Sequence, residues 1–101
     1  MIQSTATVFF SPITTWELTI KHLKGRLAYE PQEIVVGALN AGMEELPVAQ
    51  RHVRLLPDLR LPHGGPFDAM LMAQVVADGL TLVTADRNLL GSPHPTLDAR
   101  S

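Results

Sequence analysis

The chain has 101 residues, of which 46% are apolar, and its formal net charge at pH 7 is −2. This length and composition predict a single domain over residues 1–101, and they exclude a disordered chain and a global electrostatic attraction to nucleic acid. The lack of cysteine excludes disulfides and thiolate metal sites. No apolar run is long enough to span a bilayer and no signal-peptide start is visible, and the lack of cysteine fits a cytoplasmic protein.

The first element in chain order is a strand over residues 5–10, which are largely β-branched and aromatic. Ser11 and Pro12 follow as a helix start, because serine caps free N–H groups and proline needs no partner at the first helical position. Apolar residues at helical spacing then continue the helix as far as Gly25, and they are Ile13, Trp16, Ile20 and Leu23.

A second helix begins at Pro31 and ends near Gly42, and it leads into a short strand over residues 43–48. Pro47 lacks the N–H group that an inner strand would donate, so we expect this strand at an edge of the sheet. A further short helix is expected over residues 49–56.

The stretch of residues 63–86 organises the rest of the chain. Pro66 opens a helix with a wide apolar face, and Gly79 ends it. Residues 80–84 are mostly apolar, as in a strand that is covered on both faces, and a weak last strand is expected at residues 96–97. Because strands alternate with helices, the chain predicts an α/β domain with a parallel sheet between helices.

An acid lies at each end of this central stretch. Asp68 falls in the first turn of the helix, and Asp86 comes just after the strand. Ligands of open α/β sheets collect at the carboxyl edge of the strands, so both acids are candidate ligands for a hard cation such as Mg²⁺. Each also has a structural explanation, since the helix dipole favours an acid in the first turn and Asp often caps a turn after a strand.

Glu17 lies one step from the apolar stripe of the first helix. It points either along the sheet edge toward the two aspartates or to Lys21, with which it would form an ordinary helix-surface ion pair. Lys21 and Arg26 belong to a small basic cluster at the end of this helix. Cations at that place either complement the helix dipole or hold a phosphate backbone.

Three segments carry a resemblance to a known family. They are Ser-Pro-Ile-Thr-Thr-Trp-Glu with Leu-Lys-Gly-Arg-Leu (11–27), His-Gly-Gly-Pro-Phe-Asp-Ala-Met-Leu-Met-Ala-Gln (63–74) and Gly-Leu-Thr-Leu-Val-Thr-Ala-Asp (79–86). In this order and spacing they resemble the PIN-domain nucleases, in particular the VapC-like toxins of bacterial toxin–antitoxin pairs. The resemblance covers nearly the whole chain and implies a PIN-like three-layer α/β/α fold with a parallel sheet.

The resemblance also implies a function and a site. Glu17, Asp68 and Asp86 match three acids of a cluster that binds Mg²⁺ or Mn²⁺ and cuts RNA, so they would be the catalytic and metal-binding residues. Lys21 and Arg26 would then contact the RNA substrate. An antitoxin protein is the implied partner, and a homodimer is the implied assembly.

Two features depart from the family pattern. The family's opening strand, which ends in an Asp, has no counterpart here, nor has the helical segment after it, and Gly64-Gly65 stands where the family often has Arg-Asp. The sheet is therefore expected to lack its first central strand, which would leave unpaired backbone groups on the neighbouring strands. Two alternatives follow: a non-catalytic PIN remnant that dimerises or binds an antitoxin, and a chain whose true start lies upstream of Met1.

Overall fold

Strands and helices alternate along the computed structural model, which describes residues 1–59, 65–84, 90–91 and 94–98. The strands are β1 (Ile2–Gln3), β2 (Val8–Phe10), β3 (Glu44–Glu45), β4 (Thr81–Thr84) and β5 (Thr96–Asp98). The helices are α1 (Pro12–Leu23), α2 (Pro31–Asn40), α3 (Gln50–Leu55), which continues into the 3₁₀ turn η1 (Leu56–Asp58), and α4 (Pro66–Asp78). Within the described residues, no helix combines the length and the apolar character that crossing a bilayer requires.

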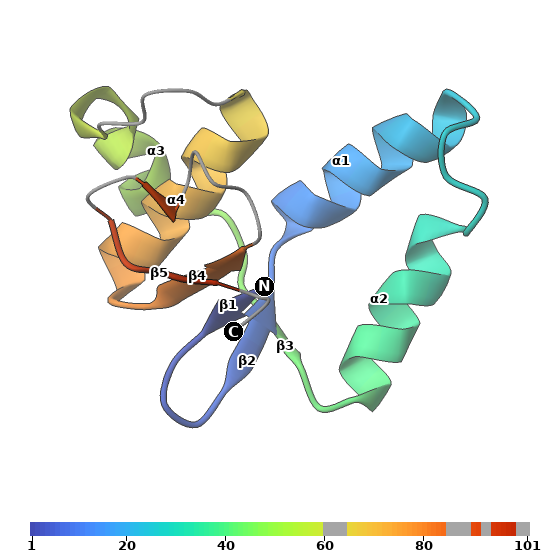
Figure 1. Cartoon of the computed structure of the whole chain (residues 1–101), viewed down its shortest axis with the longest axis horizontal. Helices are drawn as coiled ribbons and strands as arrows, with labels where there is room; N and C mark the ends of the chain where they lie inside the picture. The colour runs from blue at the N-terminus through green and yellow to red at the C-terminus, as the bar shows by residue number, and fades with distance from the viewer. Residues whose placement is uncertain (60–64, 85–89, 92–93, 99–101) are drawn as a thin grey trace.

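The strands form one sheet in the order β3-β2-β1-β4-β5. The outer pairs, β2 with β3 and β4 with β5, are parallel, whereas β1 runs antiparallel to both of its neighbours. Four strands therefore share one direction and the middle strand opposes them. Figure 1 shows α1 and α2 as a hairpin on one side of the sheet, and α3 and α4 grouped on the other. The mostly parallel sheet and the helices confirm the predicted PIN-like α/β/α fold.

The middle place of the sheet is occupied by residues at the start of the chain. Ile2 pairs with Phe9 of β2 and with Leu82 of β4, and the N–H of Val83 donates to the carbonyl of Met1 at 2.7 Å. The unpaired backbone expected of a missing first strand is therefore not found at these positions. A tight turn over residues 4–7, in which short polar side chains bond to the backbone, folds β1 back beside β2 and so reverses its direction.

The predicted helix boundaries are confirmed where short-range signals fix them. The Oγ atom of Ser11 accepts the N–H of Ile13 at 3.1 Å and caps α1. Gly25 (φ +73°) follows α1 and Gly79 (φ +65°) follows α4, and both have the left-handed conformation that glycine adopts without strain.

The core lies between β1, β4 and the buried face of α4, around Ile2, Leu82, Met72 and Val75. In contrast, α1 contains no buried residue: Trp16 of its apolar stripe is 55% exposed and Leu23 is 79% exposed. The stripe does not face the core because α1 packs beside α2 and α4 and projects away from the sheet (Figure 1). Helical spacing therefore predicted an apolar stripe but not how little of it is covered.

Candidate functional site

Glu17 lies in the second turn of α1, which begins where β2 ends. Its side chain is half-buried, whereas Lys21, one turn further on, is exposed. In the described part of the chain, Glu17 makes no ion pair or side-chain hydrogen bond, with Lys21 or with any other residue. The surface ion pair that would have explained Glu17 structurally is therefore not formed.

Asp68 is the third residue of α4, after Gly65 at the N-cap and Pro66 at the first helical position. The N-cap glycine has no side chain to accept the free N–H groups of the first turn, so the acid at this position complements the helix dipole. Asp68 is half-buried. The third predicted acid, Asp86, lies outside the described residues.

Two contacts join α1 to α4. Near the start of α1, the Oγ atom of Ser11 donates to Oε1 of Gln74 at 2.6 Å. Further along, the rings of Trp16 and Phe67 meet at a centroid distance of 4.8 Å. Because the residue number rises on α1 and falls on α4 from the first contact to the second, the two helices run in opposite directions where they touch.

These contacts bring together the two helices that carry Glu17 and Asp68. Each acid follows directly after one member of the aromatic pair, Glu17 after Trp16 and Asp68 after Phe67. The edge-to-face contact of the two rings thus connects α1 and α4 at the residues that immediately precede the two acids.

Gln74 is a buried polar residue between α1 and α4 whose contacts sequence reasoning missed. It is fully buried, and besides the bond from Ser11 its Nε2 donates to the carbonyl of Leu46 at 2.9 Å. The available signal was a polar residue inside the apolar face of α4, between Ala73 and Val75. Its partners lie in other segments, so the signal does not reveal them.

The basic side chains at the end of α1 are exposed to solvent. Lys21 and Arg26 carry them on either side of Gly25, and the backbone N–H of Arg26 closes the helix by donating to the carbonyl of Lys21 at 2.9 Å. Nearby, His22 bonds to the carbonyl of Leu27 and lies 3.3 Å from a carboxylate oxygen of Glu30. The two cations are therefore accessible to a ligand.

A second group of titratable residues joins α3 to the far end of α4. Arg51 donates to both carboxylate oxygens of Asp78, at 2.8 and 3.1 Å. The buried His52 donates from Nε2 to Asp78 at 3.0 Å, while its Nδ1 accepts the N–H of Ala49. The hydrogen bonds from Arg51 and then His52 hold the pKa of Asp78 below its usual value. Every partner is satisfied within this group, which indicates a structural clamp.

The carboxylates of the predicted site suit Mg²⁺ or Mn²⁺, which prefer oxygen ligands. Within the described residues, no group of three or more His, Cys, Asp or Glu side chains could hold a metal ion. The part of the chain that the structure describes contains two of the three predicted ligands, Glu17 and Asp68, and carries them on helices that pack together.

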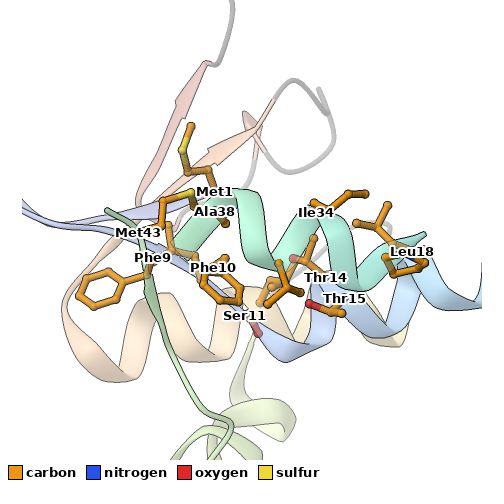
Figure 2. Close-up of a pocket in the computed structure, with 14 residues that line it drawn as sticks. Met1, Phe9, Phe10, Ser11, Thr14, Thr15, Leu18, Ile34, Ala38 and Met43 are labelled. Carbon is orange, nitrogen blue, oxygen red and sulfur yellow. The ribbon is translucent and has the colours of Figure 1, made fainter. Parts of the chain in front are cut away.

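An apolar groove lies between α1, α2 and the sheet, and Leu71 of α4 also lines it. Its volume is about 220 Å³, and Figure 2 shows side chains from all three elements around it, including Phe9, Phe10, Leu18, Ile34 and Met43. Further apolar side chains are exposed on α2, with Val36 56% and Leu39 52% accessible. The hairpin of α1 and α2 thus offers an apolar surface, and the lining of its groove includes neither Glu17 nor Asp68.

Comparison with known proteins supplies the family. The family model of the PIN domain matches residues 1–91 of this chain. A search of the curated proteins finds no significant match. PIN domains are generally nucleases that act on nucleic acids with divalent metals, in agreement with the mixed α/β fold and with acids on two packed helices. The chain belongs to the PIN domain family.

Proposed function

We propose that this protein is a VapC-like ribonuclease that hydrolyses RNA phosphodiester bonds at an acidic site with Mg²⁺ or Mn²⁺. Glu17, Asp68 and Asp86 are the proposed catalytic and metal-binding residues. The observation that carries the proposal is the packing of α1 on α4, which joins Trp16 to Phe67 directly beside two of the acids.

The helix geometry supports a common site for Glu17 and Asp68. Each helical residue advances by about 100°, so on antiparallel helices the residues that follow two facing positions turn toward the same side. We therefore expect both carboxylates on one side of the contact between Trp16 and Phe67. A half-buried carboxylate that has no partner among the described residues, such as Glu17, also gains from a bound cation.

The residues would divide the work as follows. A divalent ion in such a site activates a water molecule and stabilises the charge that develops on the phosphate. The three carboxylates would hold the ion and orient the water. Lys21 lies one helical turn beyond Glu17, on the same face of α1, and with Arg26 it would contact the RNA phosphates.

Cleavage of RNA by single-acid variants tests this proposal. A labelled single-stranded RNA is incubated with purified protein in Mg²⁺ or Mn²⁺, with and without excess chelator. We expect chelator-sensitive cleavage, reduced at least 100-fold by Glu17→Gln, Asp68→Asn or Asp86→Asn. The matched control is Glu33→Gln, an exposed acid in the first turn of α2, which should leave the rate unchanged. A folded wild-type protein that leaves RNA intact, or variants as active as Glu33→Gln, would contradict the proposal.

A second candidate function is favoured by the apolar groove and by the exposed side chains of α2. In this alternative the chain is a non-catalytic PIN module that dimerises or binds an antitoxin protein. The same surface would bind the antitoxin in the ribonuclease, and for both functions we propose a cytoplasmic location, where cellular RNA lies.

Metal binding and molecular mass separate the two candidates. A chain that is folded and dimeric but binds no Mn²⁺ supports the module. The surface is tested by Ile34→Asp in the groove, with Val53→Asp on α3 as the control at a similar exposure, 39% against 42%. Loss of the dimer or of antitoxin binding only in Ile34→Asp supports docking on the groove, and equal behaviour of the two variants excludes it.

A further inference from the structure

Gln74 is a polar side chain at the centre of α4, fully buried and without a place in the proposed chemistry. Its Oε1 accepts the hydroxyl of Ser11, and its Nε2 donates to the carbonyl of Leu46. The N–H of Leu46 in turn donates to the carbonyl of Phe10 at 2.8 Å. One side chain therefore joins α4 to the start of α1 and to the segment that follows β3.

An amide is a costly choice for this position. A Met or Leu side chain would fill a similar volume and would need no hydrogen-bond partner, whereas a buried amide is destabilising unless its partners are in place. A fully satisfied buried network rigidifies the core and selects one arrangement of the elements. Here the arrangement selected is that of α1 on α4, because Ser11 begins α1 and its hydroxyl proton is used for Gln74.

The bond between Ser11 and Gln74 lies at the same chain distance from both acids. Glu17 comes six residues after Ser11, and Asp68 comes six residues before Gln74. Because α1 and α4 run in opposite directions, both acids lie about 9 Å from the bond along the helices, in the same direction. A slip of one helix by a single residue would separate their levels by about 1.5 Å. Metal–ligand distances tolerate only about 0.2 Å.

We propose that Gln74 is a positioning residue for the acidic site: with Ser11 it fixes α1 on α4 at the level where Glu17 and Asp68 reach one ion. This inference rests on the proposed function. It assigns to Gln74 no contact with ion or RNA, and its effect is exerted through the place of α1.

The main variant is Gln74→Met, which keeps the length and apolar stem of the side chain and removes both hydrogen bonds. Ser11→Ala removes the same bond from the other helix, together with the cap of α1, and it is the second variant to measure if Gln74→Met does not fold. The control is Val75→Ala, on the same helix and equally buried, which weakens the core without touching the network. Thermal unfolding shows whether Gln74→Met and Val75→Ala lose a similar amount of stability. All binding is measured at a temperature well below the unfolding transition of each variant.

Two readouts separate positioning from stability. The first is the affinity for Mn²⁺ without RNA, from the loss of the free-ion paramagnetic resonance signal. The second is the distance between nitroxide labels on Lys24→Cys, at the end of α1, and Arg54→Cys, on α3, which packs against α4. The chain has no native cysteine, so labelling is specific, and both positions are exposed.

We expect Gln74→Met to weaken Mn²⁺ binding at least 10-fold and to shift or broaden the label distance, while Val75→Ala changes neither. Ser11→Ala should weaken Mn²⁺ binding in the wild type and should weaken it much less in Gln74→Met, where only the cap of α1 is left to lose. A Gln74→Met protein with the Mn²⁺ affinity and label distance of Val75→Ala overturns this inference alone. A folded wild type that binds no Mn²⁺ overturns the proposed function, and the role of Gln74 in the site with it.

Discussion

The ring of Trp16 stands edge-on to the ring of Phe67, with centroids 4.8 Å apart and planes inclined by 80°. In this T-shaped arrangement the positive edge of one ring meets the negative face of the other. Trp16 is nevertheless 55% exposed, so burial alone does not hold it in place. The contact anchors the middle of α1 to the first turn of α4, beside Glu17 and Asp68.

Removing either ring should destabilise the protein through this contact. In a double-mutant cycle of Trp16→Ala and Phe67→Ala, we expect a coupling of about 0.5–1.5 kcal/mol beyond the lost area. Urea unfolding gives the four free energies. Leu23→Ala, at the most exposed apolar position of the same helix, should change stability by less than about 0.5 kcal/mol and show no coupling with Phe67→Ala. Coupling as weak as that of Leu23 would show that the rings do not hold α1 on α4.

Gly37 and Gly79 both have room for a Cβ atom but differ in backbone conformation. Substitution by alanine should therefore change the stability of the fold in opposite directions at the two positions. A Cβ atom would meet nothing within 4 Å at Gly37, inside α2, or at Gly79, after α4. Gly37→Ala should stabilise the fold by about 0.4–1 kcal/mol, because alanine reduces the entropy of the unfolded chain. Gly79→Ala should destabilise it by about 1–2 kcal/mol, since φ is +65° there. Thermal unfolding of both variants checks the sign, and equal signs would contradict the account.

The clamp at Asp78 predicts a stability that falls in acid. The hydrogen bond from Arg51, and then that from His52, lowers the pKa of Asp78 in the folded state. The contribution of Asp78 to the free energy of unfolding is therefore complete above its pKa in the unfolded chain. It is lost as the pH falls through the lowered pKa of the folded state. The difference in unfolding free energy between wild type and Asp78→Asn should shrink between pH 7 and pH 3, and a constant difference would contradict this.

Asp78 has one buried partner, His52, and one exposed partner, Arg51, and the loss of each should have a different effect on stability. Asp78→Ala at pH 7 should cost about 1–3 kcal/mol, because the buried Nε2 of His52 loses its acceptor. Arg51→Ala should cost clearly less, since the Arg51 side chain is 58% exposed and water replaces its bonds. Urea unfolding at pH 7 compares the two, and an equal or larger loss for Arg51→Ala would contradict the clamp.

Lys21 and Arg26 should contribute to RNA binding through phosphates rather than bases. Each alanine substitution should weaken binding of different RNA sequences equally, and it should reduce the slope of log affinity against log salt by about 0.7. Binding to catalytically inactive Asp68→Asn protein, measured by fluorescence anisotropy over a range of salt, tests this. Arg54→Ala, on α3, is the control at another exposed cation. A slope unchanged from that of Arg54→Ala would remove both residues from the RNA contact.

Short-range sequence signals predicted the boundaries of the helices, but they did not predict which strands pair in the sheet. Ser11 with Pro12 and the glycine after α4 act on their own neighbours, so sequence alone was sufficient. The strand of Ile2 and Gln3 is too short to show a periodicity, and its place depends on Leu82, near the other end of the chain. The reversal of that strand could not be read from the sequence for the same reason.

The candidate site shows the same division. Glu17 and Asp68 lie on the helices that the sequence predicted for them, and those helices pack together. Gln74 was missed because its importance comes from Ser11 and Leu46, which are distant along the chain. The groove was missed because helical spacing identifies an apolar face but does not show how far the neighbouring elements cover it.

The central claim is that Glu17, Asp68 and Asp86 share one divalent ion. Crystals grown with Mn²⁺ test it most directly, because anomalous scattering locates the ion independently of any activity. The account predicts one peak bound by the carboxylates of Glu17 and Asp68, with Asp86 completing the site, and loss of that peak in Asp68→Asn. A folded protein with its Mn²⁺ elsewhere, and with the carboxylates of Glu17 and Asp68 on opposite sides of the contact between α1 and α4, would contradict the account.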